Sequence, residues 1–202
     1  MNCIYLIDTC GISVADLPQR FNDYKPELKD TAKKINSFLA YEFLKHIACE
    51  LLNTDKDKIT IKFTENGKPY IENSQNFYFS ISHSENIIAV AIADSELGVD
   101  IEKIRAINTS LPRRFFTKNE IDYIEKNTAK NNDAFFELWT KKEAYIKQKG
   151  LNLSHLSKID VTSDNIKNNF LSCKTDNYFL SAYSEADITF KIIKLNKKHL
   201  LP

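Results

Sequence analysis

The feature of this 202-residue sequence that most limits its fold is an order of strand and helix patterns that occurs twice. A strand candidate at residues 2–7 precedes a long helix pattern after Asp30, and a second strand candidate at 97–101 again precedes helix patterns. The other strand candidates lie at residues 59–63, 68–72, 77–82, 87–93, 158–162, 168–173, 178–184 and 188–194. The recurrence predicts an α+β pseudo-dimer of two similar halves, residues 1–96 and 97–202, each with a small antiparallel sheet packed on a long helix.

Signals at the helix ends support these assignments. Asp30 is a favourable N-cap residue. The apolar residues that recur at helical spacing after it are Ile35, Leu39, Phe43, Ile47 and Leu51. Thr117 and Glu120 form a T-x-x-E capping box, which predicts a helix from about residue 117. Gly150 is placed to end a further helix over 133–149, because glycine adopts the left-handed conformation readily.

Glycine is scarce, and its distribution excludes one way of binding phosphate. The chain has four glycines, about 2% of its residues against a usual share of about 7%. Gly11, Gly67, Gly98 and Gly150 are isolated, so no glycine-rich loop can hold a phosphate through backbone N–H groups. Any phosphate must therefore be held by side chains or by a metal ion.

Charge and cysteine content indicate a cytoplasmic protein with neither nucleic acid nor membrane as partner. The 28 basic and 27 acidic residues nearly cancel, and no run approaches 18 apolar residues. The N-terminus lacks a basic leader, and the four cysteines show no zinc spacing, so reduced thiols are expected. Residues 50–100 hold nine acids and four bases, whereas residues 103–150 hold eleven bases and six acids. The basic segment is either a solvated helix or a face for an acidic partner.

Asp100 and Glu102 are candidate metal ligands. In a strand, Val99 and Ile101 face one side and these two carboxylates lie together on the other. An ordinary exposed strand face with acids on it is the plain alternative. The carboxylates repel each other unless a cation lies between them, and oxygen ligands of this kind suit Mg²⁺.

Trp139, Glu143 and Lys147 follow at i, i+4 and i+8 along one side of the predicted helix. The plain alternative is an amphipathic helix in which Glu143 and Lys147 form an ion pair worth about 0.3 to 0.5 kcal/mol. The functional interpretation makes Glu143 a third metal oxygen and Lys147 a compact positive charge for a phosphate.

Two further polar segments are candidates for phosphate or nucleotide contacts. Ser82 and His83 end a strand, and no acid at triad spacing argues for Ser/His catalysis. His83 is therefore interpreted as a hydrogen-bond donor to a phosphate. Lys68 and Pro69 follow Gly67 in what is by itself a hairpin turn.

Together these motifs resemble the 4′-phosphopantetheinyl transferases of the larger, pseudo-dimeric type that activate peptide, polyketide and related synthases. The matching segments are GKPYI at 67–71, FSISHS at 79–84, GVDIE at 98–102, RRFFTKNE at 113–120 and FELWTKKEAYIKQKG at 136–150. They cover the central half of the chain, and the pair formed by GVDIE and W-x-x-K-E-x-x-x-K is the specific part.

The resemblance implies an Mg²⁺-dependent transfer of the 4′-phosphopantetheine arm of coenzyme A to a serine of an apo acyl or peptidyl carrier protein, which releases adenosine 3′,5′-bisphosphate. It implies Asp100, Glu102 and Glu143 as metal ligands, and Glu143, Glu102 and Lys147 as catalytic residues. The implied coenzyme A contacts are Lys33, Ser37, Lys68, Pro69, Ser82, His83, Lys142 and Lys147.

The resemblance does not by itself identify the residue that binds the 3′-phosphate or the contacts for the carrier protein. Asn36 stands where the family usually has an arginine for the 3′-phosphate, so Lys33, or Lys29 or Lys34, is expected to replace it. Phe115 and Phe116 are either apolar contacts for the carrier protein or residues of the core. A monomer is expected, acting in nonribosomal peptide, polyketide or fatty acid synthesis. The alternatives are a non-catalytic coenzyme A or carrier-binding module of the same fold and a metal-dependent phosphodiesterase.

Overall fold

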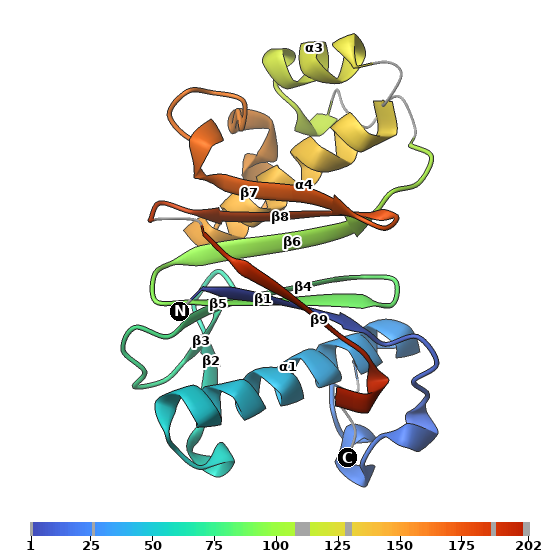
Figure 1. The fold of residues 1–202 in the computed structure, drawn as a ribbon, viewed down its shortest axis with the longest axis vertical. Coiled ribbons are helices and arrows are strands. Elements are labelled where there is room, and N and C mark those ends of the chain that lie inside the picture. Colours follow the sequence, from blue (N-terminus) through green and yellow to red (C-terminus); the bar gives the residue numbers. More distant parts are fainter. Residues whose placement is uncertain (1, 26, 108–113, 128–130, 187–188, 200–202) are drawn as a thin grey trace.

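The structure, a computed structural model, describes residues 2–25, 27–107, 114–127, 131–186 and 189–199. Two stacked β-sheets lie between helix α1 (Thr31–Leu52) and helix α4 (Asn131–Lys149), with α3 (Lys118–Lys126) beside α4 (Figure 1). The mixed α+β class predicted from the sequence is confirmed.

The two sheets repeat one arrangement. In the first, β1 (Cys3–Asp8) leads through α1 and a small β2 (Ile61–Phe63) and β3 (Pro69–Ile71) hairpin to β4 (Tyr78–Ser84) and β5 (Ile87–Ala93). In the second, β6 (Leu97–Lys103) leads through α3 and α4 to β7 (Phe170–Thr175) and β8 (Tyr178–Ser184). The strand orders β4-β5-β1 and β7-β8-β6 correspond, and all these pairings are antiparallel.

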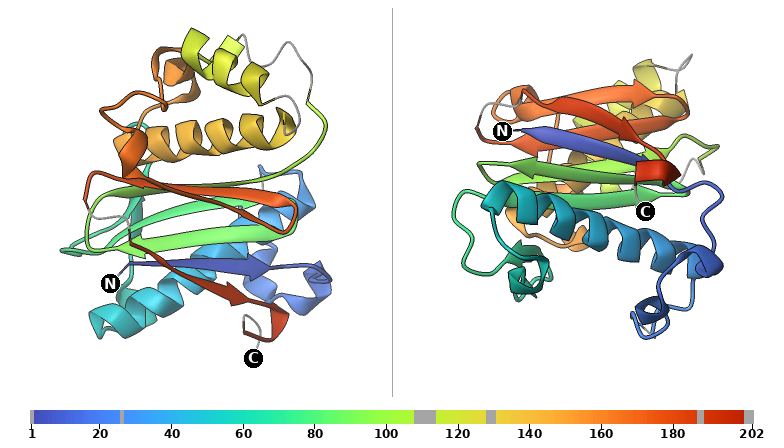
Figure 2. Two further views of the ribbon diagram at one scale, coloured as in Figure 1. Left: turned by 45° about the horizontal axis from the view of Figure 1, so that its top comes forward. Right: turned by 60° about the horizontal axis from the view of Figure 1, so that its bottom comes forward.

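The C-terminal strand departs from this plan. β9 (Lys191–Leu195) pairs in parallel with β1, so the first sheet has the order β4-β5-β1-β9 and is mixed. The two strands lie side by side in both views of Figure 2. The expected antiparallel sheet therefore needs correction, because Ile193 and Leu195 pack against the core beneath α1 instead of extending the second sheet. Residue 188, where the predicted strand begins, lies outside the described residues.

A second correction concerns the predicted strand at 158–162, which is a loop after a 3₁₀ turn, Leu153–Lys158. Side chains satisfy its backbone instead of a neighbouring strand. Val161 donates its N–H to Glu120 Oε1 (2.9 Å), and Thr162 donates its N–H to Asp160 Oδ1 (3.0 Å). The apolar residues do alternate here, but carboxylates, rather than a neighbouring strand, accept the backbone N–H groups.

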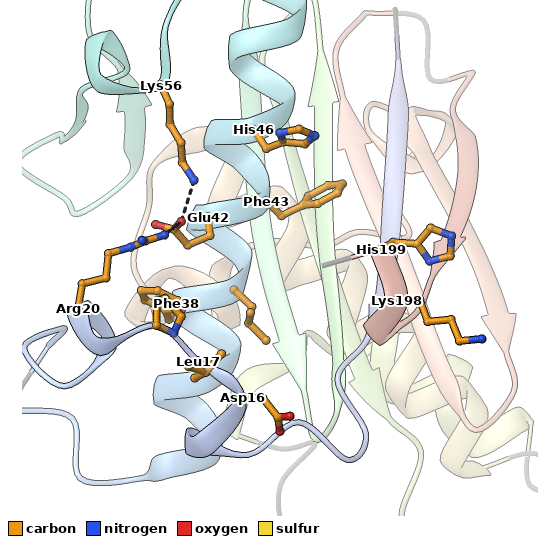
Figure 3. Close-up of a pocket in the computed structure, with 12 residues that line it drawn as sticks. Asp16, Leu17, Arg20, Phe38, Glu42, Phe43, His46, Lys56, Lys198 and His199 are labelled. Atoms are coloured by element: carbon orange, nitrogen blue, oxygen red, sulfur yellow. Dashed lines mark hydrogen bonds and ion pairs between the residues drawn. The ribbon is translucent and has the colours of Figure 1, made fainter. Parts of the chain in front are cut away.

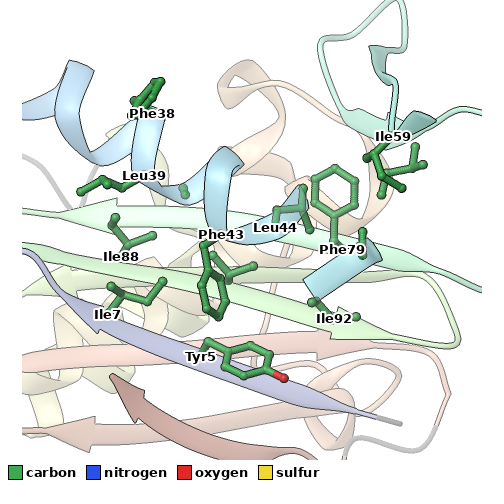
Figure 4. Close-up of a cluster of buried hydrophobic side chains, with 14 of the residues drawn as sticks. Tyr5, Ile7, Phe38, Leu39, Phe43, Leu44, Ile59, Phe79, Ile88 and Ile92 are labelled. Carbon is green, nitrogen blue, oxygen red and sulfur yellow. The ribbon is translucent and has the colours of Figure 1, made fainter. Parts of the chain in front are cut away.

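Separate apolar layers hold α1 and the two sheets together. Under α1, aromatic and aliphatic side chains interlock, and Tyr5 meets Phe43 edge to face at 5.0 Å between ring centroids (Figure 4). Between the sheets, Ala89 and Ala91 of β5 face Val99 and Ile101 of β6, so small side chains allow close approach. Among the described residues, no helix has the length and apolar character needed to cross a membrane.

α4 lies directly on the backbone of β6 at Gly98. A Cβ atom at this position would be 1.9 Å from the carbonyl oxygen of Ala144 and 2.6 Å from the backbone nitrogen of Gln148. Only glycine permits this approach. It brings the side chains of α4 over the even-numbered residues of β6.

We predict that Gly98→Ala destabilises the protein by about 2 to 3 kcal/mol, because α4 must move away from β6. Gly67→Ala is the matched control, since Gly67 has open space around its Cα but a φ of 82°. Its cost is expected to be about 1 kcal/mol. Urea unfolding of both variants measures the difference, and a milder effect at Gly98 would contradict the close-packing account.

Candidate active site

Most of the predicted site residues line one cleft of about 540 Å³ between the two halves of the chain. The predicted residues in its lining are Ser37, Lys68, Pro69, Ser82, His83, Asp100, Glu102, Glu143 and Lys147. They come from α1, from the β2–β3 hairpin, from β4, from β6 and from α4, which lie far apart in sequence. The packing of these elements therefore creates the cleft.

The acidic part of the cleft is built by β6 and α4. Asp100 and Glu102 lie on the face of β6 shared with Gly98, and Glu143 and Lys147 are one helical turn apart on α4. Lys147 Nζ contacts Asp100 Oδ1 (2.8 Å) and the carbonyl oxygen of Val99 (3.1 Å). Lys147 thus ties α4 to β6 rather than serving only as an exposed partner for Glu143.

Three serines of β4, here called the serine seam, join the first sheet to β6. Ser80, Ser82 and Ser84 alternate along the strand and are each 7% exposed. Val99 and Lys103 of β6 donate backbone N–H groups to Ser80 Oγ and Ser84 Oγ, both at 3.0 Å. The seam also contacts the acids of β6.

Two seam hydroxyls donate to the acidic side chains. Ser82 Oγ donates to Asp100 Oδ1 (2.7 Å) and Ser84 Oγ donates to Glu102 Oε2 (2.8 Å). The first half of the chain therefore orients two carboxylates of the second half. Ser82, expected to contact coenzyme A, is engaged with Asp100 in this structure.

The acidic side chains are partly buried and repel one another. Burial raises the pKa of Glu143 to about 7, with Asp100 and Glu102 adding to the shift and Lys147 opposing it. Burial and then Asp100 also raise the pKa of Glu102. Asp100 Oδ2 is buried and has no hydrogen-bond partner among the described residues. These are properties that a bound cation would relieve.

The donor chemistry fits a hard divalent cation, but the ligand set is not preassembled. Carboxylate oxygens suit Mg²⁺, and the partnerless Asp100 Oδ2 is a candidate donor. Within the described ranges, no three His, Cys, Asp or Glu side chains converge closely enough to hold a metal ion. The set Asp100, Glu102 and Glu143 therefore stays a prediction.

The other side of the cleft is polar or basic. Burial, followed by Lys147 and Lys33, lowers the pKa of His83, so its imidazole is neutral at pH 7. Lys68 Nζ contacts the carbonyl oxygen of Gln148 (2.7 Å) near the end of α4 and also pairs with Glu96. Lys68 thus bridges the hairpin of the first half to α4 of the second.

The structure does not place Lys142 in the cleft. Its side chain is fully buried, and Nζ lies 2.5 Å from Glu120 Oε2 and contacts the carbonyl oxygen of Ile159. Glu120 also accepts the N–H groups of Thr117 and Val161. The expected coenzyme A contact of Lys142 is therefore corrected: this lysine joins α4, α3 and the loop at 159–161.

Lys33 and Asn36 also differ from the expected arrangement. Lys33 is 64% exposed at the start of α1, where its Nζ is 4.0 Å from Asp30, and it does not line the cleft. Asn36 is buried and donates to the carbonyl oxygen of Glu85 (2.6 Å). The asparagine in the arginine position therefore has a structural contact.

Sequence reasoning missed Lys25 and Tyr41, both of which line the cleft. Lys25 Nζ donates to Ser37 Oγ (3.0 Å) and lies over the rings of Tyr24 (5.4 Å) and Tyr41 (5.2 Å). No carboxylate is among these contacts. Lys25 precedes the helix in a segment without a period, so only the tertiary structure brings it to Ser37.

The predicted carrier contacts divide between surface and core. Phe116 is buried in the cluster around α3 and α4, whereas Phe115 is half-buried and meets Trp139 edge to face at 5.5 Å. Trp139 itself lines the cleft. Arg113, which begins the RRFFTKNE motif, lies outside the described residues.

A larger hollow, of about 760 Å³, lies beside α1 and is shown in Figure 3. Several of its charged groups pair with one another or with neighbours. Arg20 and Lys56 both contact Glu42 Oε2, at 2.5 Å and 2.8 Å, and Asp16 pairs with Lys197. The cleft, with its crowded acids, is therefore the candidate active site in spite of its smaller volume.

The chain belongs to the 4′-phosphopantetheinyl transferase superfamily, whose model matches residues 96–198. A second model, described as the N-terminal part of 4′-phosphopantetheinyl transferase, matches residues 23–95. The two models together include every residue of the cleft described above.

Individual relatives carry the same family name. The chain is 38% identical to 4′-phosphopantetheinyl transferase ffp of Bacillus subtilis over 55% of its own length and 50% of the relative's. It is 39% identical to Sfp of Bacillus subtilis strain 168 over 50% and 45% of the two lengths, and 27% identical to HetI of a Nostoc species over 58% and 53%. The matches thus span about half the length of these curated relatives.

We predict that the metal-free protein loses stability as pH rises between about 4.5 and 7, because folding raises the pKa of Glu143 to about 7. The folded state holds this proton more tightly than the unfolded state, so the advantage disappears as the unfolded chain ionises first. The loss due to Glu143 should be on the order of 3 kcal/mol.

Urea unfolding in a chelator at several pH values measures this loss. Glu143→Gln should reduce the dependence on pH to the part that Glu102 contributes. The control Glu137→Gln on the same helix, where Glu137 pairs with Lys141, should retain the full dependence. Equal pH profiles for wild type and Glu143→Gln would contradict the assignment.

Proposed function

We propose that the protein transfers the 4′-phosphopantetheine arm of coenzyme A to a serine of an apo acyl or peptidyl carrier protein, with Mg²⁺ as cofactor. The observation that carries the proposal is the meeting of Asp100, Glu102, Glu143 and Lys147 with His83 in one cleft, in a chain of this superfamily. Crowded carboxylates next to lysine and a neutral histidine suit a reaction of a pyrophosphate.

The proposed architecture is a pseudo-dimer with coenzyme A bound between its halves, residues 1–96 and 97–202. The repeated strand order and the position of the cleft support it. Because one chain supplies both walls of the cleft, we expect a monomer, and we expect it in the cytoplasm with the synthases it serves.

In the proposed reaction the serine oxygen of the carrier forms a bond to the phosphorus that bears pantetheine, and the bond to the second phosphate of the pyrophosphate breaks. Adenosine 3′,5′-bisphosphate leaves. Mg²⁺, held by Asp100, Glu102 and Glu143, would neutralise charge on the pyrophosphate. Lys147 adds a positive charge beside the same acids and steadies the phosphoryl group.

Glu143 is the proposed acceptor of the serine proton, directly or through a water that it orients with Glu102. A pKa of about 7 suits a group that must take a proton near neutral pH. His83 is neutral and half-buried, so it serves as a hydrogen-bond donor to coenzyme A phosphate. Lys68 and Pro69 line the adenine side.

We further propose that Lys25 and Ser37 hold the 3′-phosphate of coenzyme A. They meet at 3.0 Å in the cleft, and the contacts of Lys25 leave its charge without a carboxylate partner among them. Asn36 is engaged with Glu85 and Thr9, so it is not available for this role.

An acidic carrier fits the surface next to the cleft. Arg114 lies over the ring of Phe115 at 5.3 Å, and Phe115 contacts Trp139 at the cleft. The positive charge of Arg105 lowers the pKa of Glu102 and so opposes the effect of burial. Basic and aromatic groups beside an active site suit a partner with negative charge and a small apolar contact.

The direct test is incubation with coenzyme A, Mg²⁺ and several apo carrier domains. The carrier should gain about 340 Da, the mass of the arm that a metal-assisted transfer moves. Glu143→Gln should lose at least about 100-fold in rate because it cannot accept the proton. Glu137→Gln is again the control on α4 and should retain its rate.

Other outcomes would identify the alternatives. Coenzyme A binding without transfer to any carrier would favour a non-catalytic binding module, and hydrolysis of coenzyme A without a carrier would favour a phosphodiesterase. Wild-type rates in Glu143→Gln would remove Glu143 from the mechanism.

For the 3′-phosphate we predict that Lys25→Ala raises the KM for coenzyme A about tenfold, as expected for loss of a charged hydrogen bond of about 1.5 kcal/mol. The KM for 3′-dephospho-coenzyme A should not change. Lys33→Ala, which removes an exposed lysine from the start of α1, is the control. An equal effect of Lys25→Ala on both donors would contradict the assignment.

A further inference from the structure

Ser84, at the end of β4, has its hydroxyl fixed in one direction. It accepts the backbone N–H of Lys103 (3.0 Å), which can only donate, and it donates to Glu102 Oε2 (2.8 Å), which as a carboxylate can only accept. Ser84 thus contacts both the side chain of Glu102 and the peptide group that follows it. With the serine 7% exposed, there is little room for water to replace either contact.

The turn that follows Ser84 is held by buried groups of the first half. Asn36 Nδ2 donates to the carbonyl oxygen of Glu85 (2.6 Å), while Asn36 Oδ1 accepts the hydroxyl of Thr9 (2.9 Å). Thr9 also donates its N–H to the carbonyl oxygen of Asn86 (2.8 Å). Both ends of the Asn36 amide are therefore committed, and the end of β4 has a fixed position relative to α1 and β1.

The geometry points to Ser84 as a positioning residue that sets the orientation of the Glu102 carboxylate toward a divalent cation, an inference that rests on the proposed function. Glu102 is half-buried beside Asp100, and its described hydrogen bond is the one from Ser84. Outer groups that hold a metal ligand in place typically change metal affinity by about 10-fold to 100-fold. Asn36 supports the same orientation through the turn at Glu85.

Ser80 is a matched control for Ser84. It lies on the same strand, has the same exposure, and accepts a backbone N–H from β6, that of Val99, at the same distance of 3.0 Å. It makes no contact with a carboxylate among the hydrogen bonds of the described residues. Ser80→Ala and Ser84→Ala therefore remove equivalent structural contacts, and only the second frees Glu102.

The experiment uses Mn²⁺ as a probe and follows its binding to the full chain by electron paramagnetic resonance. Ser84→Ala should weaken Mn²⁺ binding by about tenfold or more. Ser80→Ala should leave it unchanged, and Ser84→Thr, which keeps the hydroxyl, should restore it. Calorimetric titration with coenzyme A in a chelator should give one affinity for wild type, Ser84→Ala and Ser84→Thr, because Ser84 does not line the cleft.

Each other result would overturn the inference in a distinguishable way. If wild type binds no Mn²⁺, both the proposed metal site and the role of Ser84 are refuted. If wild type binds Mn²⁺ and Ser84→Ala binds it as well as Ser80→Ala does, only the role of Ser84 is refuted. If Ser84→Ala also loses coenzyme A binding in the chelator, the serine maintains the whole cleft rather than the orientation of Glu102.

Discussion

Close packing of β6 between α4 and β4 is the constraint on which the cleft depends. On one side, the absent side chain of Gly98 lets the backbone of α4 rest on the strand. On the other, the serine seam gives the backbone of β6 hydrogen-bond acceptors where the two sheets meet without a ladder. One strand thereby brings its acids within reach of Lys147 from α4 and of serine hydroxyls from β4.

This arrangement crowds like charges at a cost in stability. Burial and mutual repulsion raise the pKa of Glu143 and of Glu102, and one oxygen of Asp100 lacks a partner among the described residues. Lys147 offsets part of the repulsion by contacting Asp100. Unfavourable electrostatics in a cleft are typical of groups arranged for a ligand, whereas a structural ion pair would satisfy its own charges.

Lys142 and Lys147 illustrate how much of the site could be predicted from the sequence. The two lysines are five residues apart, which separates them by about 140° around a helix. Lys142 follows Leu138 and precedes Ile146 at spacings of four, so it lies within a buried apolar stripe. The expected coenzyme A contact of Lys142 was therefore wrong for a reason already present in the pattern. Its buried partner Glu120, 22 residues away, could not be predicted from the pattern.

The sequence by itself determined the elements and the faces of their side chains: the Asp30 N-cap, the capping box at Thr117, the glycine that ends α4, and the shared face of Asp100 and Glu102. These depend on neighbours within a few residues, where periodicity and turn chemistry decide. Only the tertiary structure decided that β9 joins the first sheet, that Lys25 meets Ser37, and that Ser84 holds Glu102. Those contacts join segments distant in sequence, and packing between whole layers, rather than local preference, brings them together.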